Sequence, residues 1–421
     1  MWSQKFNIGD IKEIDISVRS VINNVKAKYP LQMNSSLYLP RKIGGRGLKS
    51  LETTYKKTKV TAAMNLLTRD DPRMECVRQF EKKRMEKGRS SCITDAKRFA
   101  AEDFNLEFEP AENGFVVHYQ KDGETKSTSN KNAVKNMMKK NVTEMLLNET
   151  YASKWQGVIF SIRKNDPDID LDKCFAWLSK WKDAPVDVIN DFQSIYLQIV
   201  PTLTFKKFRG EGHITSTVCR LCSQGVESVK HLLSNCSKFI SHAYKRRHDR
   251  VLQYIMFKYL HKMNMIKDLP AWYTKVSIKP YYEKEGVEVY WDIPEYSGYS
   301  NETEHGPLRP DAKIVNKTSK TILVLEMSIP WVENRKTKLV EKEEKYTNIV
   351  QNLKIDNPGY TVQQLTFIVD CLGGYSKDLR ASLETLGLTK PEVNSILPGI
   401  QKILVIEANS VINHFKVLTM K

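Results

Sequence analysis

The fold is decided by Leu308-Arg309-Pro310-Asp311-Ala312-Lys313-Ile314-Val315 and, after a short polar turn, Thr321-Ile322-Leu323-Val324-Leu325-Glu326-Met327-Ser328. These aliphatic and β-branched runs predict the two strands of a hairpin, each carrying one carboxylate, Asp311 or Glu326. A lysine-rich helix is expected to follow, from Lys336 to about Lys354. Two acids and a lysine held close together suit metal-assisted phosphodiester hydrolysis, because the acids hold a cation that activates water.

The composition predicts a folded protein with a polyanionic partner. At 421 residues the chain is long enough for two or three domains, and its 41% hydrophobic and 27% charged residues are typical of globular proteins. The 66 Lys and Arg exceed the 49 Asp and Glu and give a formal charge of +17, spread along the chain. This surplus favours nucleic acid over an anionic membrane, since no basic amphipathic anchor is visible; a merely soluble basic protein is the alternative.

The amino terminus and the cysteines predict an intracellular protein that does not bind a membrane. Residues 1–6 contain no apolar signal core, and the apolar runs look far shorter than a membrane span. Of the seven cysteines, three cluster between residues 219 and 236 and the others are scattered. In a reducing compartment, clustered cysteines indicate a metal site rather than disulfides.

The cysteine cluster has the spacing of a zinc site. Cys219, Cys222, His231 and Cys236 form the pattern C-x2-C-x8-H-x4-C, so four ligands can surround one tetrahedral Zn²⁺. Because all four positions are protein ligands, the site should be closed and structural; chance placement of the cysteines is the alternative. We expect that His213, just upstream, is not a ligand. The basic run 244–251 follows on a helix able to hold phosphate.

Regular periodicities place further elements on both sides of this cluster. Helices are expected at 10–28, 52–67, 131–147, 155–162, 171–181 and 186–197, and a hairpin is expected around the Asp122-Gly123 pair. A glycine-rich basic loop at 38–51 could approach a phosphate or could be a plain turn between helices. Trp155, Trp177 and Trp181 are expected in the core rather than as base-stacking platforms.

The carboxyl-terminal pattern predicts a mixed α/β sheet flanked by helices, so the whole chain is expected to be an α+β multidomain protein. Strands are expected at Lys275–Ile278, Val287–Trp291, Ala312–Val315, Thr321–Met327 and Leu365–Cys371, with helices at about 335–354, 376–388 and 395–418. From the residues alone, Asp311 and Glu326 could equally be surface acids at strand edges. Similarly, Lys338, Lys342 and Lys345 share a helix face that an ordinary salt-bridged surface helix would also show.

The carboxylate motif resembles a known family. Arg309-Pro310-Asp311, Glu326, Pro330 and Lys342-x-x-Lys345-Tyr346 resemble the PD-(D/E)xK restriction-like endonuclease of site-specific non-LTR retrotransposons. Cys219 to Cys236 followed by Tyr244-x-x-Arg247-His248-Asp249 is similar to the zinc knuckle and Arg-His-Asn box of that family, with Asp249 in the Asn place. Residues 367–374 resemble its late strand with a Gly-Leu-Gly turn, and residues 39–48 resemble its reverse-transcriptase thumb, so the resemblance covers essentially the whole chain.

Two positions depart from the family pattern. Glu326 stands where the family usually has aspartate, which PD-(D/E)xK chemistry tolerates, and Ser328 stands where a lysine two residues later is usual. The family places its lysine on the following helix, which makes Lys342 and Lys345 the candidates. No Tyr/Phe-Ala-Asp-Asp palm motif occurs, so we expect that the chain lacks a polymerase core and does not copy RNA by itself.

The resemblance implies a domain order and a function. It implies a thumb-like helical segment at 1–68, a mostly helical basic linker at 69–208, the CCHC knuckle with its basic helix at 209–262 and a restriction-like endonuclease domain at 263–421. The expected activity is nicking of target DNA, in the nucleus, to prime reverse transcription, with DNA and possibly element RNA as partners. The alternative is a catalytically idle, zinc-dependent nucleic-acid-binding remnant.

The resemblance also implies the roles of individual residues. Asp311 and Glu326 would hold Mg²⁺, and Lys342 or Lys345 would stabilise charge or orient water. Arg247, His248 and Tyr346 would contact DNA.

Overall fold

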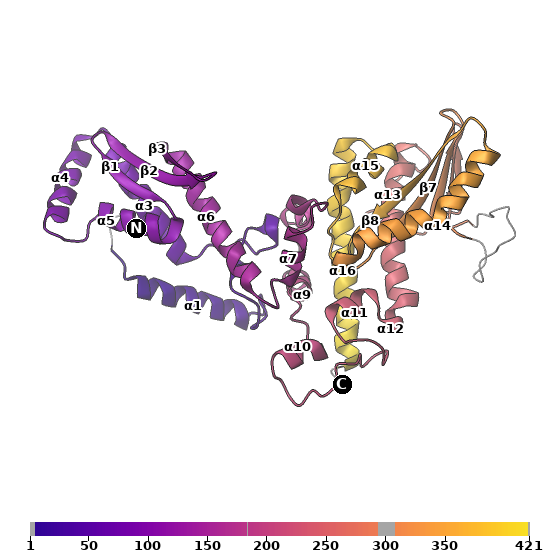
Figure 1. Ribbon diagram of the computed structural model, residues 1–421, viewed down its shortest axis with the longest axis horizontal. Coiled ribbons are helices and arrows are strands. Elements are labelled where there is room, and N and C mark those ends of the chain that lie inside the picture. Colours follow the sequence, from indigo (N-terminus) through magenta and orange to yellow (C-terminus); the bar gives the residue numbers. More distant parts are fainter. Residues whose placement is uncertain (1–4, 183, 294–307, 420–421) are drawn as a thin grey trace. The chain divides into compact units, whose positions relative to one another are not determined.

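The structure, a computed structural model, describes residues 5–182, 184–293 and 308–419. It divides into two compact units, unit 1 (Met1–Ser153) and unit 2 (Lys154–Lys421). Each unit combines helices with one β-sheet (Figure 1), which confirms the expected α+β class. Residues 1–4 belong to the segment that is predicted to lack a signal core, and they lie outside the described residues.

Unit 1 is mainly helical and has a three-stranded antiparallel sheet. Its elements are α1 (Ile8–Asn24), α2 (Ser35–Tyr38), η1 (Arg41–Ile43), α3 (Leu51–Thr68), α4 (Pro72–Glu86), α5 (Cys92–Phe104), β1 (Glu107–Ala111), β2 (Gly114–Lys121), β3 (Glu124–Thr128) and α6 (Lys131–Ala152). Asp122 and Gly123 link β2 and β3 with φ angles of 55° and 81°. Positive φ at both central residues is what a tight two-residue hairpin turn needs, so the hairpin predicted there is confirmed.

One hydrophobic core runs through unit 1. Tyr55 and Met64 of α3 belong to the same buried cluster as Phe104 of α5, Phe115 of β2 and Val134 of α6. Because α5, β2 and α6 bury their apolar faces against α3, residues 69–153 pack with the helices that precede them. The division in the structure therefore falls at residue 153, and it differs from the expected boundaries at 68 and 208.

Unit 2 begins with short helices and continues into a long helical core. Its helices are α7 (Val158–Lys164), η2 (Leu171–Lys173), α8 (Ala176–Lys180), α9 (Val186–Tyr196), α10 (Leu203–Phe208), α11 (Val229–Ser234), α12 (Ser237–Phe239), η3 (Ile240–Tyr244), α13 (Lys245–Lys262), η4 (Val332–Asn334), α14 (Arg335–Asp356), α15 (Lys377–Thr385) and α16 (Lys390–Thr419). The helix expected at 171–181 is broken into η2 and α8. Trp177 is buried, as predicted, whereas Trp155 is half-buried and stacks on Phe208 with ring centroids 4.4 Å apart.

The sheet of unit 2 has five strands in the order β4-β5-β6-β7-β8. They are β4 (Tyr281–Lys284), β5 (Val287–Trp291), β6 (Ala312–Asn316), β7 (Thr321–Ser328) and β8 (Thr361–Ile368). All neighbours are antiparallel except β7 and β8, which are parallel. The prediction of a strand at 275–278 is wrong, because that segment is an irregular loop in which residues 275–277 are exposed. The last predicted strand begins four residues and ends three residues earlier than expected, because the chain turns away after Ile368.

Helices cover both faces of this sheet. Leu323, Leu325 and Met327 of β7 pack into the core formed with α13, α15 and α16. The alternate side chains of β7, which include Val324 and Glu326, are also buried, and α14 contacts β7 and β8 (Figure 1). Since side chains of a strand alternate, Glu326 points to the face opposite Met327. This places one acid of an otherwise apolar strand next to the lysine-rich helix.

Helix α16 is the central core element of unit 2. By length and composition it is apolar enough to cross a membrane, with a mean hydropathy of 1.2 over its best window, so the expectation that no run approaches a span does not hold for it. Within the structure, 72% of that window is buried. Burial of this extent is ordinary for the core helix of a globular domain, which meets the same criterion.

Candidate active site and metal centre

Asp311 and Glu326 come together at one end of the β6–β7 hairpin. Ala312 pairs with Leu325 in the antiparallel register, so Asp311 and Glu326 are the next residues along the two strands. The Asp311 carboxylate accepts a hydrogen bond of 2.7 Å from the Met327 backbone N–H, which fixes it beside β7. The predicted juxtaposition of the two acids is therefore present.

Glu326 is a buried carboxylate with one oxygen left over. Its side chain is only 3% exposed, and its Oε1 accepts from the Lys342 ammonium. Its Oε2 has no hydrogen-bond partner among the described residues. Burial, and then the neighbouring Asp311 charge, raise the pKa of Glu326, while Lys342 opposes this shift. An unsatisfied buried carboxylate oxygen is costly, so a further positive group at this position could stabilise Glu326.

The two candidate lysines occupy different environments. Lys342 reaches the Glu326 carboxylate, whereas Lys345 is exposed and its Nζ lies 3.2 Å from the Tyr346 hydroxyl. Lys342 also lines the pocket described below, together with Lys338 from the preceding turn of α14. The structure thus brings Lys342 into direct contact with Glu326, whereas Lys345 acts on that carboxylate only through its charge.

His248 joins the acids from α13. Its Nε2 lies 3.2 Å from Oδ2 of Asp311 and 3.2 Å from the Met327 carbonyl oxygen, and its Nδ1 lies 3.1 Å from Oδ1 of Asp249. Burial alone lowers the pKa of His248, but the bonds to Asp249 and Asp311 outweigh burial and raise the pKa to about 10. The ring is therefore an imidazolium at neutral pH and partly neutralises Asp311.

Two residues expected to contact DNA are buried instead. Arg247 is 3% exposed and Tyr346 is 1% exposed. The Tyr346 hydroxyl lies close to Glu326, but it donates its single proton to the Arg309 carbonyl oxygen at 2.9 Å. Both side chains donate to backbone carbonyl groups inside the fold, and Arg247 also lines the pocket described below, so direct DNA contact by either side chain stays a prediction.

A pocket of about 290 Å³ opens beside these residues. It is lined by Asp311, Glu326, His248 and Lys342 on one side and by the end of α11, with Ser234 and Asn235, on another. Polar side chains from β6, β7, α13 and α14 therefore converge on one cavity. The contribution of α11 was not foreseen from the sequence, since Ser234 and Asn235 carry no distinctive pattern.

The four predicted zinc ligands also come together. The ligand atoms of Cys219, Cys222, His231 and Cys236 all lie within 4.8 Å of one another, and Cys222 Sγ lies 3.2 Å from His231 Nε2. In a tetrahedral zinc site the ligand atoms are on the order of 3.5 Å apart, so three thiolates and one imidazole suit this metal. The cluster could hold a zinc-like ion. His213 is not part of it, as expected.

Local backbone geometry builds the cluster. Gly225 has a φ of 65°, and a side chain added there would meet the His231 ring at 3.1 Å, so glycine lets the loop approach the imidazole. Ser228 caps α11 by accepting from the His231 N–H. Glu227 is fully buried and forms a bidentate ion pair with Arg220, with its closest contact at 2.8 Å, which closes the loop on itself. The Leu203 N–H at the start of α10 donates to the same carboxylate at 2.8 Å and fastens the loop to that helix.

The cluster and the carboxylate pocket share their supports. Arg247 donates to the carbonyl oxygen of Leu233 at 2.9 Å and to that of Ile329 at 3.3 Å. Lys230 of α11 pairs with Glu333 of η4 at 2.9 Å. Because Leu233 lies between the candidate ligands His231 and Cys236 and Ile329 directly follows β7, a displacement of the cluster would reach the strand that carries Glu326.

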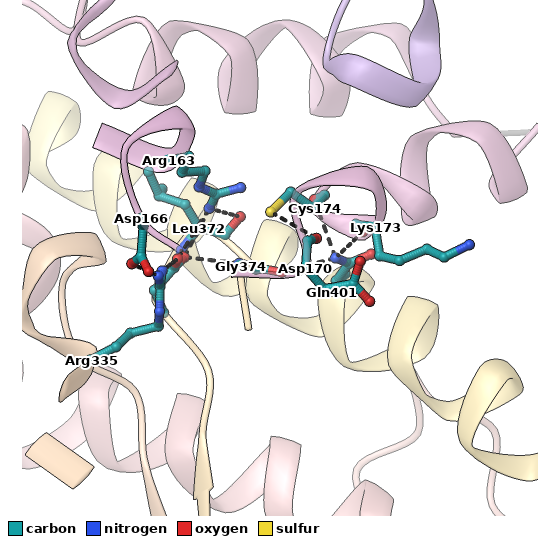
Figure 2. Close-up of polar contacts among 11 residues, drawn as sticks. Arg163, Asp166, Asp170, Lys173, Cys174, Arg335, Leu372, Gly374 and Gln401 are labelled. Carbon is teal, nitrogen blue, oxygen red and sulfur yellow. Dashed lines mark hydrogen bonds and ion pairs between the residues drawn. The ribbon is translucent and has the colours of Figure 1, made fainter. Parts of the chain in front are cut away.

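A buried ion network holds the start of α14 (Figure 2). Asp370, after β8, is fully buried and accepts from Arg163 of α7 at 3.0 Å and from Arg335 at 2.9 Å; Arg335 also pairs with Asp166. The N–H groups of Leu372 and Gly374 donate to the same carboxylate at 2.9 and 3.0 Å. Burial alone lowers the pKa of Arg163, but Asp370 outweighs it and raises the pKa. The network fixes α14, and with it Lys342, relative to the sheet.

No protein-family model matches this chain, and no curated protein matches its sequence.

Proposed function

We propose that unit 2 is a divalent-metal-dependent DNA endonuclease, the nicking portion of a non-LTR retrotransposon protein, whose cut supplies a primer for reverse transcription. The observation that carries the proposal is the unpartnered Oε2 of buried Glu326 beside Asp311. Hard divalent cations bind such carboxylate oxygens. When bound, Mg²⁺ would activate water and screen the scissile phosphate.

The chain's own residues fit the remaining requirements. Lys342 holds the Glu326 carboxylate and lines the pocket, where its ammonium can stabilise charge on a phosphate. His248 and the Met327 N–H orient Asp311 through the same oxygen, Oδ2. In this proposal the Cys/His cluster is a zinc knuckle that supports one wall of the pocket, and the protein acts in the nucleus.

A basic groove in unit 1 supports the proposal that the protein binds nucleic acid, either DNA or element RNA. The groove has a volume of about 1180 Å³ and lies along α1, α3, α6 and the 38–50 loop. Lys49, Lys57, Lys135 and Lys139 line it without an ion-pair partner among the described residues. Burial, and then Lys139 and Lys49, lower the pKa of Lys57. Crowded cations of this kind favour a polyanion.

The second candidate is a nucleic-acid-binding protein with idle acids. It is favoured by the pairing of each carboxylate with a cation of its own, Glu326 with Lys342 and Asp311 with His248. Acids whose charge is neutralised in this way can be held in the fold without a metal ion.

Supercoiled plasmid with and without Mg²⁺ separates the two candidates. We expect the parent protein to nick it, and Asp311→Ala and Glu326→Gln to lose nicking while keeping DNA affinity. Glu343→Gln, which changes an exposed acid of α14, is the matched control and should keep full activity. Nicking retained by Asp311→Ala, or DNA binding without Mg²⁺-dependent cleavage by the parent, would overturn the nuclease assignment.

A further inference from the structure

Helix α13 carries a second pocket on the face opposite His248. Arg246, Arg250, Gln253 and Phe257 follow one another at steps of four, three and four residues, so they share one helix face. With the loop at 270–277 they enclose a pocket of about 190 Å³, which we call the α13 pocket. The proposed nuclease function uses none of these residues.

A buried glutamate sets the two arginines in place. Glu407 of α16 is 2% exposed and accepts from Arg246 Nε at 2.8 Å and from Arg250 Nη1 at 2.5 Å. Two guanidinium groups on one carboxylate leave a net positive charge, and no acid lines the pocket. The α13 pocket therefore offers preoriented cations to an anion.

Further donors in the α13 pocket are not used by the protein. The Arg250 side chain is 16% exposed, yet Nη1 is its one nitrogen with a partner among the described residues. The Gln253 amide and the Tyr254 hydroxyl have no hydrogen-bond partner within the described part of the chain. A guanidinium and an amide side by side can read the hydrogen-bonding edge of a planar base.

Aromatic rings line the α13 pocket from both sides, Phe257 from α13 and Trp272 from the loop. Phe257 is 8% exposed, and Trp272 packs edge-on against Trp181 with ring centroids 5.4 Å apart. Lys402 lies 5.7 Å from the Trp272 ring. The volume is below that of pockets for drug-sized molecules, which start at about 300 Å³, so it suits a single ring system.

We infer that the α13 pocket binds one unpaired nucleotide of a single-stranded nucleic acid. The base would lie against Phe257 and Trp272 with its edge toward Gln253 and Arg250, and the phosphate would lie at Arg246. A strand is favoured over a free nucleotide because exposed Lys275 and Tyr273 continue from the pocket along the same loop. This inference goes beyond the proposed nuclease and does not need Asp311 or Glu326.

Fluorescence anisotropy of the full chain with labelled single-stranded and duplex oligonucleotides tests the inference. We expect Gln253→Ala to weaken single-strand binding by about tenfold, the scale of one stacked and recognised base, and to leave duplex affinity unchanged. Ala271→Trp fills the pocket from an exposed position and should have the same effect. Gln363→Ala and Ala381→Trp, at exposed positions elsewhere in unit 2, are the matched controls and should bind like the parent protein.

Comparison of DNA and RNA oligonucleotides shows which kind of single strand the pocket binds. A loss confined to oligodeoxynucleotides assigns the pocket to a DNA strand, and a loss confined to oligoribonucleotides assigns it to RNA. Unchanged single-strand affinity in both pocket variants, an equal loss in the controls, or competition by a nucleoside monophosphate as effective as that of the oligonucleotide would overturn the inference. Plasmid nicking by Gln253→Ala is measured in parallel, so failure of the nuclease proposal and failure of this one are separate results.

Discussion

Arg247 donates from α13 to the carbonyl oxygen of Leu233, 2.9 Å away on the helix that carries His231. Its Nη2 donates to the carbonyl oxygen of Ile329, the residue directly after the strand that carries Glu326. A single buried guanidinium thus connects the Cys/His cluster with the carboxylate strand. The metal centre and the pocket should therefore respond together when either is disturbed.

Removal of the cluster metal should lower both stability and nicking. We expect the purified protein to contain about one zinc ion per chain and His231→Ala to lose it, because a structural zinc site contributes folding free energy. The melting temperature should fall, and Mg²⁺-dependent nicking should fall with it. Elemental analysis and thermal melting provide the measurement. Cys76→Ser, at an exposed cysteine outside the cluster, is the control, and a zinc content unchanged in His231→Ala would contradict the assignment.

Arg247→Met should destabilise the protein without weakening DNA affinity. The substitution leaves the Leu233 and Ile329 carbonyl groups without their donor, which costs about 1–3 kcal/mol for each buried group left unsatisfied. Urea unfolding measures this loss, and the salt dependence of DNA binding measures the number of phosphate contacts. Lys245→Ala, its exposed neighbour, is the control. A reduced salt slope in Arg247→Met alone would show that Arg247 contacts DNA after all.

The Asp311–Glu326 pair could be predicted from sequence because strand register follows from local spacing. A short turn between two apolar runs leaves little freedom in the pairing, so the acids fall on neighbouring strand ends. The choice between Lys342 and Lys345 could not be made in this way. Residues three apart on a helix share a face, and only the packing of α14 on β7 decides which ammonium reaches Glu326.

Burial of charged residues was the main feature that sequence did not reveal. Arg247 lies in a basic run that is typical of an exposed helix, and its partners are backbone carbonyl groups that no side-chain pattern marks. Asp370 and Arg163 are 207 residues apart, so their pairing depends on tertiary structure alone. An acid at the end of the apolar run 365–371 was the one available signal for Asp370.

Lys342→Ala should abolish nicking, whereas Lys345→Ala should retain most of it. Lys342 contacts Glu326 and lines the pocket, while Lys345 is exposed over the Tyr346 ring. Loss of a positioned charge at the reacting centre costs about a hundredfold or more in rate. Single-turnover nicking at saturating protein measures the chemical step apart from binding. Equal losses in the two variants would show that the helix contributes general charge rather than a positioned ammonium.

Glu392 should contribute stability that depends on pH. Its carboxylate accepts from Lys262 at 2.7 Å, and this bond, followed by that from the Thr389 N–H, lowers the pKa of Glu392 to about 2. A carboxyl group whose pKa is lowered by folding stabilises the fold at pH values above its unfolded pKa of about 4.3. This contribution is lost as the pH falls toward 2. We expect the urea midpoint of Glu392→Gln to lie below that of the parent at neutral pH and the two to converge in acid. A pH-independent difference would contradict this.

Asp370→Asn should be the most destabilising of these substitutions. It removes the carboxylate that faces Arg163 and Arg335, and an uncompensated buried charge costs about 3–5 kcal/mol. Gly374→Ala tests the same network by geometry, since the added carbon would lie 2.4 Å from Asp370 Oδ2 and 2.9 Å from the Arg163 guanidinium carbon. Gly359→Ala is the comparison, because Gly359 has a φ of 89° and no neighbour within 4 Å and so tests backbone strain without a clash, whereas Gly374 is not a positive-φ glycine and tests the clash alone. Urea unfolding should rank Asp370→Asn and Gly374→Ala well below Gly359→Ala. Parent-like stability in Asp370→Asn would mean that the arginines have other acceptors, and that α14 is held in place by apolar packing instead.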